Sequence, residues 1–281
     1  MDTKNTNIYH TKIKEYSHCI KVYSYRDPKI KPGKYAQKSH PNLVPKNDLS
    51  EDEIELLREE NLKANIYKVR TRIYDLIFNN EFDYFVTLTF DPKIEEQNGL
   101  SKLEQNDLRY EEMKLWLQSM RKQAKRRGEE FRYFFVPELH TGTGKNSGTI
   151  HWHGLIGGYC PKLKDSGKKY HNLIVYNLVS WEYGYSNVQR IRSKKRIANY
   201  VRKYITKDLL NSPVRKHKKK YWASKNLQKP KVDFIDEKIN WSKELHRFAN
   251  WSSDDGQVEI YEMSKAEYQK ITEDKNIKKV E

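Results

Sequence analysis

Residues 131–158 read FRYFFVPELHTGTGKNSGTIHWHGLIGG and contain the pattern that decides the fold. The aromatic and apolar run at 131–139 is typical of a buried strand, and TIHWHGLIGG at 149–158 is a second strand of the same kind. The Gly, Ser and Asn residues at 141–148 are typical of a turn. We therefore expect the two strands to pair as a hairpin.

His151 and His153 lie two positions apart on the second of these strands. Side chains at i and i+2 of a strand point to the same face, about 6.5–7 Å apart, which is close enough to share a metal ion. Glu138 ends the first strand, where a carboxylate among apolar neighbours needs a partner. In the hairpin Glu138 comes near the histidine pair, so the three residues predict a metal site.

Two histidines and a carboxylate suit a divalent ion such as Mn²⁺ or Mg²⁺, and Zn²⁺ is a further candidate. His140 is a competing ligand that ranks lower because it falls at the turn. The simpler alternative is that the histidines only satisfy buried hydrogen bonds. A lone histidine would favour that alternative, whereas a pair with this spacing on a buried strand favours metal binding.

The rest of the chain alternates helices and strands. Helices are predicted at 53–79, 106–128 and 194–210, and further strands at 82–90, within 181–191, near 232–235 and near 258–261. The chain lacks the Gly-rich turns of a doubly wound sheet, so the predicted fold class is α+β, with a central antiparallel sheet and flanking helices. Residues 1–48 are expected to form an N-terminal extension, 49–212 the main domain and 213–281 a basic C-terminal extension.

The composition of the 281 residues limits the class of protein. A net charge of +16 and a mean hydropathy of −1.00 resemble a disordered chain, but 12% aromatic residues supply the apolar surface of a folded one. No apolar run of about 18 residues occurs, which excludes a membrane span. The start of the chain lacks the apolar region of a signal peptide. Two cysteines exclude a disulfide framework and fit the cytoplasm.

The positive charge is concentrated in one stretch. Residues 189–220 contain thirteen basic side chains and one acidic one, a net +12 of the total +16. Such a concentration suits contacts with phosphates. The predicted nucleic-acid contacts are Arg190, Arg192, Lys194, Lys195, Arg196, Arg202 and Arg215. For residues 215–220 a solvated, flexible tail is an equally good interpretation.

Tyr200 and Tyr204 are one helical turn apart in the predicted helix, and Lys203 and Lys207 share their face. An apolar stripe on another face would dock on the sheet, and it consists of Ile197, Ala198, Val201, Ile205 and Leu209. A phenol with a pKa near 10 is a poor nucleophile without positive charge nearby, so the lysines favour a catalytic role. The alternative is that both tyrosines only form the edge of the core.

Three motifs together resemble the HUH superfamily of rolling-circle replication initiator endonucleases. They are VTLTF at 86–90, HWHGLI at 151–156 and NYVRKYITK at 199–207. Their order, spacing and two tyrosines are similar to the initiators of small single-stranded DNA phages and related plasmids. YWASKNL at 221–227 also resembles a segment of that group, and the resemblance covers roughly residues 65–230.

The resemblance implies a metal-dependent endonuclease and strand transferase with an RRM-like, ferredoxin-like fold. Its metal ligands would be His151, His153 and Glu138. A tyrosine would attack the scissile phosphate, leaving a 5′-phosphotyrosyl enzyme and a free 3′-OH that primes replication. One departure is Trp152, a bulky residue in the hydrophobic middle position of the histidine motif.

The resemblance also implies a role for each residue of the tyrosine motif. Tyr200 would be the first nucleophile, because its spacing to Lys203 is that of one-tyrosine relatives. Tyr204 would attack the next junction, so that the two tyrosines alternate. Lys203 and Lys207 would stabilise charge on the phosphoryl oxygens or the tyrosinate.

The partners implied are single-stranded origin or hairpin DNA and the helicase and replication proteins of a bacterial host, in whose cytoplasm the protein would act. A helicase is needed because the chain contains no ATPase motif. Three alternatives remain: a transposase or relaxase on the same fold, a non-catalytic nucleic-acid-binding module with an RRM-like sheet, and a zinc hydrolase.

Overall fold

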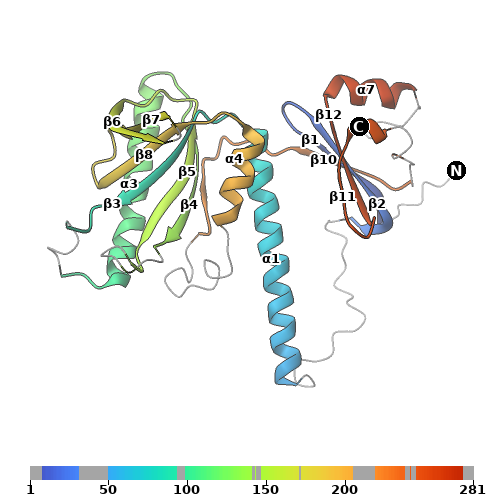
Figure 1. Ribbon diagram of the computed structural model, residues 1–281, viewed down its shortest axis with the longest axis horizontal. Coiled ribbons are helices and arrows are strands. Elements are labelled where there is room, and N and C mark those ends of the chain that lie inside the picture. Colours follow the sequence, from blue (N-terminus) through green and yellow to red (C-terminus); the bar gives the residue numbers. More distant parts are fainter. Residues whose placement is uncertain are drawn as a thin grey trace. The chain divides into compact units, whose positions relative to one another are not determined.

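The computed structural model describes residues 8–31, 50–93, 99–140, 143, 147–170, 172–204, 219–237, 241 and 245–274. The chain divides into two compact units, one of residues 52–228 and one of residues 1–51 with 229–281. Each unit contains an antiparallel sheet with flanking helices (Figure 1), which confirms the predicted α+β class. No helix in the described part of the chain is long and apolar enough to cross a membrane.

The larger unit is built on a seven-stranded antiparallel sheet with the strand order β6-β7-β8-β3-β5-β4-β9. The strands are β3 (Tyr84–Phe90), β4 (Arg132–Leu139), β5 (Ile150–Gly157), β6 (Leu163–Tyr170), β7 (Leu173–Leu178), β8 (Gly184–Arg190) and β9 (Trp222–Ala223). The predicted hairpin is formed by β4 and β5. The sequence pattern predicts turns where β6 and β7 lie. That prediction is wrong because β6 is a largely exposed edge strand, whose polar side chains show no apolar alternation.

The helices of this unit are α1 (Glu51–Asn79), α3 (Lys102–Arg126) and α4 (Lys194–Val201), which continues as a 3₁₀ turn, η2 (Arg202–Tyr204). Helix α3 begins at a capping box of Ser101 and Glu104, and Gly128 follows its end with φ +70°. The helix predicted at 194–210 is therefore α-helical only to residue 201. Residues 205–210 lie outside the described part of the chain.

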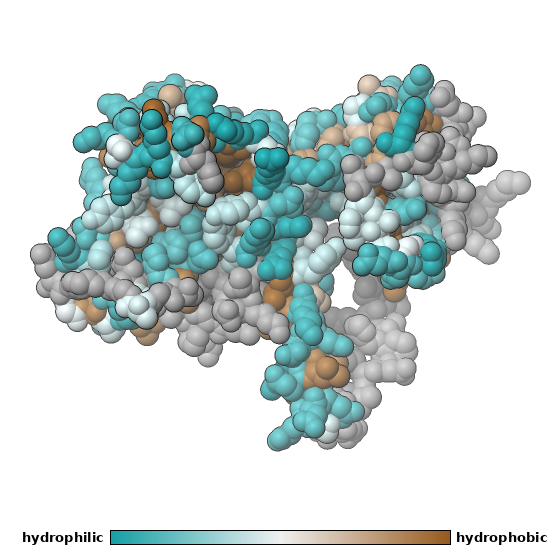
Figure 2. Space-filling view, in the orientation of Figure 1, coloured by the Kyte–Doolittle hydropathy of each residue, from teal (hydrophilic) through white to brown (hydrophobic). Residues whose placement is uncertain are grey.

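Helix α3 covers one face of the sheet with a large aromatic core. Its Met113, Trp116 and Met120 are buried against side chains of β3, β4 and β5, including Trp152. Trp116 meets the Phe135 ring edge-on at 5.8 Å between centroids. Figure 2 shows mostly hydrophilic side chains on the visible face of the molecule, as expected when few apolar residues are available.

Gly154 follows the histidine pair at a position where no side chain fits. A Cβ at this position would lie 2.1 Å from Cδ1 of Phe135 and 2.6 Å from the carbonyl oxygen of Phe134. Gly154 and Phe135 are partners across the β4–β5 ladder, and the Phe135 ring is fully buried. The missing side chain of Gly154 therefore makes room for a core aromatic ring next to the predicted metal ligands.

The smaller unit has a five-stranded antiparallel sheet with the order β10-β1-β2-β12-β11. Its elements are β1 (Ile8–Glu15), β2 (Ile20–Ile30), β10 (Lys231–Ile235), a 3₁₀ turn η4 (His246–Phe248), β11 (Ala249–Ser252), β12 (Val258–Met263) and α7 (Lys265–Asp274). Val22, Tyr261 and Trp241 are buried in its core, and the Trp241 indole N–H donates to the Thr11 hydroxyl. Strands β1 and β2 lie in the predicted N-terminal extension. The pattern does not show them because they pair with strands more than 200 residues away.

We expect Gly154→Ala to destabilise the protein strongly, because the added methyl group overlaps the Phe135 ring. Overpacking of this kind costs roughly 3 kcal/mol of unfolding free energy at its upper range. Denaturant unfolding of the wild type and the variant measures the loss. In the background of Phe135→Leu the same substitution should cost less, and an equal cost in both backgrounds contradicts the steric explanation.

Candidate active site

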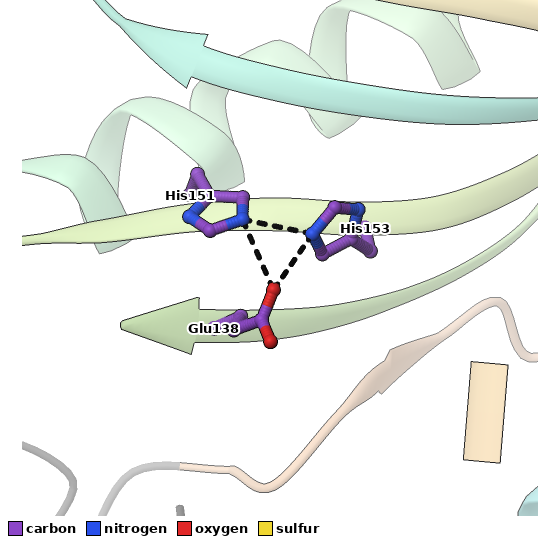
Figure 3. Close-up of side chains that lie close together, drawn as sticks. All are labelled: Glu138, His151 and His153. Atoms are coloured by element: carbon purple, nitrogen blue, oxygen red, sulfur yellow. Dashed lines mark hydrogen bonds and ion pairs between the residues drawn. The ribbon is translucent and has the colours of Figure 1, made fainter. Parts of the chain in front are cut away.

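Three of the predicted ligands converge on one point of the sheet. His151 and His153 lie on β5, and Glu138 is the direct partner of His151 on β4. The Glu138 Oε2 atom lies 3.1 Å from Nε2 of His151 and 2.8 Å from Nε2 of His153, and the two nitrogens are 2.8 Å apart (Figure 3). The donor atoms of these three residues all lie within 4.8 Å of one another, so the group could hold a metal ion.

The chemistry of the donor set fits a divalent ion. Two Nε2 atoms at 2.8 Å cannot both carry a proton without repulsion, so a lone pair faces the centre of the group. The Nδ1 atom of His153 lies 3.0 Å from the hydroxyl of Thr87, its partner on β3. A proton on this Nδ1 leaves Nε2 free as a ligand atom, which is the usual arrangement in metal-binding histidines. Thr87 belongs to the VTLTF motif.

The ionisation of the group also suits metal binding. Burial raises the pKa of the Glu138 carboxyl, but the hydrogen bonds and charges of the two histidines outweigh burial and hold this pKa at about 2. Burial lowers the pKa of His153, although the hydrogen bond to Glu138 opposes the shift. Near neutral pH the structure therefore favours an ionised carboxylate and a neutral imidazole, the forms that bind metal ions.

His140, the competing ligand, lies beside the group but is not part of it. Its ring packs on the His151 ring with 3.9 Å between centroids. Burial lowers the pKa of His140 to about 4, with further contributions from the charges of His151 and Arg109. Among the described residues, the cluster of metal-ligating atoms consists of Glu138, His151 and His153 alone. His140 therefore acts as a neutral aromatic wall behind His151.

Two polar residues of α3, which the sequence pattern does not single out, hold the start of β5. The Asn106 amide donates to the carbonyl of Gly148 at 3.0 Å and accepts from the N–H of Ile150 at 2.8 Å. The guanidinium of Arg109 is fully buried and donates to the carbonyl of Ile150 at 2.7 Å. A polar pair at i and i+3 on the apolar face of the predicted helix is the available signal. These bonds fix the backbone next to the first ligand, His151.

Trp152 holds the same strand from the other face. Its side chain is fully buried, with the Tyr110 ring edge-on at 5.3 Å and the Trp222 ring at 5.4 Å. Trp222 belongs to the YWASKNL segment and forms the edge strand β9 against β4. The bulky residue in the middle of the histidine motif is therefore a core anchor, and the two histidines project from the opposite face.

The tyrosine helix packs on the face that carries the histidines. Ala198 and Val201 of the predicted apolar stripe are fully buried, whereas Ile205 and Leu209 lie outside the described residues. The Tyr204 ring stacks on the His153 ring with 4.1 Å between centroids and 9° between planes. This stack places one of the two predicted nucleophiles directly beside a metal-ligating side chain.

The two tyrosines differ in their surroundings. The Tyr204 hydroxyl donates a hydrogen bond to the Tyr200 hydroxyl at 2.8 Å. Burial, followed by this hydrogen bond, raises the pKa of Tyr204. The Tyr200 side chain packs edge-on against Phe85 at 5.4 Å and is 44% exposed. Tyr204 is thus a buried donor, and Tyr200 is an accessible acceptor.

The predicted basic residues surround the tyrosine helix without touching the metal ligands. Lys203 is exposed and forms no hydrogen bond or ion pair with a ligand residue in the described part of the chain. Lys194 pairs with Glu81, and Arg202 lies over the Tyr74 ring at 5.7 Å. The other described members of the predicted contact set are exposed, and they are Arg190, Arg192, Lys195 and Arg196. Lys207 and Arg215 lie outside the described residues.

Comparison with known proteins links this region to replication. Residues 83–209 match the family model of the Replication-associated protein ORF2. The matched region is less than half of the chain, but it includes β3, both ligand strands and the tyrosine helix. Comparisons with curated proteins and with solved structures give no match. The chain is thus similar to a replication-associated family over the region that forms the site.

We expect Thr87→Val to weaken metal binding by about 10- to 100-fold, the usual effect of removing a hydrogen bond that orients a ligand histidine. The substitution keeps the shape of the side chain but removes the hydroxyl beside Nδ1 of His153. Titration calorimetry with Mn²⁺ measures the affinity. Thr89→Val on the same face of β3 is the matched control, and equal affinities for both variants would contradict the role of Thr87.

Proposed function

We propose that the protein is a rolling-circle replication initiator that nicks single-stranded origin DNA through a tyrosine and later rejoins the strand. The observation that carries this proposal is the stacking of Tyr204 on His153 within the Glu138–His151–His153 group. The similarity of residues 83–209 to a replication-associated family supports the same assignment. Neither a hydrolase that uses only the metal nor a binding module explains why two hydroxyls are placed beside the ligands.

The metal would be held by His151, His153 and Glu138, and Mn²⁺ or Mg²⁺ suits a substrate with phosphate oxygens. When bound, the ion supplies Lewis-acid polarisation of the scissile phosphate. The protein side chains keep the ligands in their metal-binding form. Thr87 orients His153, and the ionised Glu138 provides the negative ligand.

Tyr200 is the proposed first nucleophile. Its oxygen would bond to the phosphorus in line with the departing O3′ atom, which leaves with the electron pair of the broken P–O bond and gains a proton. The products are a 5′-phosphotyrosyl bond and a free 3′-OH. The hydrogen bond from Tyr204 would stabilise negative charge on the Tyr200 oxygen as its own proton is lost to solvent, to which Tyr200 is exposed.

Tyr204 would act in the second transfer. Once Tyr200 carries the DNA, Tyr204 keeps its position on the His153 ring and no longer has a free phenol to bond. It could then attack the next junction, while the 3′-OH of the first strand attacks the phosphotyrosyl bond and rejoins the DNA. Lys203, exposed between the two tyrosines in sequence, and Lys207 would stabilise charge on the phosphate oxygens.

Single-stranded DNA would be held by the basic residues around the helix. Arg190, Arg192, Lys195 and Arg196 are exposed and can contact phosphates without breaking an interaction in the core. A helicase and replication proteins of the host would unwind and copy the DNA. A transposase or relaxase would use the same chemistry, and its DNA substrate, rather than its site, would distinguish it.

We expect the protein to form a covalent adduct with labelled single-stranded origin DNA in the presence of Mn²⁺. Tyr200→Phe combined with Tyr204→Phe should lower adduct formation by about 10³-fold or more, as loss of a nucleophile does. Tyr185→Phe, an exposed tyrosine on β8, is the matched control. His151→Ala, or removal of the ion with EDTA, should lower the rate by several orders of magnitude. Persistence of the adduct in the double variant would falsify the tyrosine mechanism.

The single variants separate the two tyrosines. Tyr200→Phe should lose most of the first adduct, because the accessible nucleophile is removed, whereas Tyr204→Phe should keep the first cleavage and lose the second transfer. Denaturing gels of cleaved and rejoined strands measure both steps. The opposite pattern would assign the first attack to Tyr204. If the protein binds the DNA tightly but gives no adduct with any divalent ion, it is a non-catalytic binding module.

A further inference from the structure

A groove of about 880 Å³ lies in the larger unit between α1, α3 and the segment around β9. Its lining combines positive charge with aromatic rings. The cations are Arg72, Lys114, Arg121, Lys219, Lys220 and Lys225, and the aromatic residues are Tyr110, Tyr133, Tyr221 and Trp222. Among the lining residues Glu111 is the single acid. None of the nucleic-acid contacts predicted around the tyrosine helix lines this groove.

The charge of the groove is largely uncompensated. Glu111 pairs with Lys114 of its own helix at 2.9 Å. Arg72, Lys220 and Lys225 make no ion pair with any carboxylate in the described ranges of the chain. Small-molecule sites of about 300–1,000 Å³ are lined mainly by apolar residues. A groove of this size lined by six cations instead suits a polyanion.

The aromatic residues favour unpaired bases over a duplex. Tyr221 and Trp222 are only partly buried, and their rings are held in place by stacking on Phe134 at 5.0 Å and by packing on Trp152 at 5.4 Å. Rigid aromatic side chains beside a cationic path are the usual platform for single-stranded nucleic acid, whose bases are free to stack. In a duplex the bases are stacked on one another, and only the cations could be used.

The groove lies on the other side of β5 from the metal ligands. Its wall includes Tyr110 and Trp222, which both pack on Trp152, while His151 and His153 project from the opposite face of the strand. A DNA strand that reaches both places would have to pass the sheet edge formed by β9, beside Lys219 and Lys220. The groove can thus hold DNA without competing for the catalytic face.

A smaller cavity of about 480 Å³ marks one end of the cationic surface. It shares Arg121, Tyr133 and Lys225 with the groove, and it adds two acids, Glu129 and Glu130. Each of these acids lies near an arginine, at 4.0 Å in the pair of Glu129 with Arg127 and at 3.3 Å in the pair of Glu130 with Arg132. The favourable path for a polyanion therefore runs from this end toward α1 and Arg72.

We propose that the groove between α1, α3 and β9 binds a single-stranded segment of the DNA substrate outside the segment that is cut. Identifying the ligand as DNA rests on the proposed function. The groove would keep hold of the strand during the interval between the first and second transfer. It would add affinity that does not depend on the metal or the tyrosines.

The test uses the double variant Lys220→Glu and Lys225→Glu. The matched control, Lys164→Glu with Lys168→Glu, changes the net charge equally on the exposed strand β6 at the opposite edge of the same sheet. Fluorescence anisotropy with a labelled oligothymidylate of about 30 nucleotides, in EDTA, measures binding at several salt concentrations. We expect the groove variant to lose about tenfold or more in affinity. The slope of log affinity against log salt should fall by roughly 1.4, since two phosphate contacts are lost.

Equal losses in the groove variant and the control overturn the proposal, and so does equally tight binding of a duplex of the same length. Lys220→Gln with Lys225→Gln, which removes charge without reversing it, should lose affinity to a smaller degree. Thermal unfolding shows whether each variant keeps its fold. Adduct formation by the wild type with Mn²⁺ is measured separately. Without an adduct the proposed function fails, whereas normal binding by the groove variant refutes only the groove.

Discussion

The antiparallel pairing of β4 with β5 is the constraint on which the rest of the site depends. Its register sets Glu138 directly opposite His151, so that a carboxylate and an imidazole from different strands share one point. A slip of one residue would turn one strand's ligands to the α3 face and take the group apart. The register is held from the α3 side, where Arg109 binds the backbone at the start of β5 and Gly154 accepts the ring of Phe135. Packing in the core therefore determines chemistry on the opposite face.

Strand β5 separates two functions by its alternation. Its odd positions carry the ligands, beside the tyrosine helix, and its even positions, including Trp152, anchor the strand to α3 and β9. A small ligand group on a twisted sheet is easily misaligned, and an error of about 1 Å weakens a metal or catalytic site considerably. The large, fully buried Trp152 explains how a protein with few apolar residues achieves this rigidity. It concentrates aromatic packing on the one strand that must not move.

The parts of the structure that could be predicted are those with local patterns. The hairpin, the histidine pair and Glu138 follow from alternation, a turn and an isolated carboxylate within 28 residues. Thr87 could not be assigned to His153 from the sequence, because its contact depends on the pairing of strands 66 residues apart. Strands β1 and β2 escaped prediction for the same reason, since their partners lie near the other end of the chain. The 3₁₀ turn that ends α4 carries no signal in an otherwise regular helical pattern.

Tyr200 and Tyr204 have equal status in the sequence, and the fold alone makes them different. Both lie on one helical face with lysines nearby, a pattern that predicts a pair of equivalent hydroxyls. The stack on His153 buries Tyr204 and commits its proton to Tyr200, while Tyr200 stays open to solvent. Because each environment is set by a neighbour on β3 or β5, the asymmetry lasts as long as the sheet and helix stay packed. An ordered use of two chemically identical nucleophiles needs such a difference, and here burial together with one hydrogen bond supplies it.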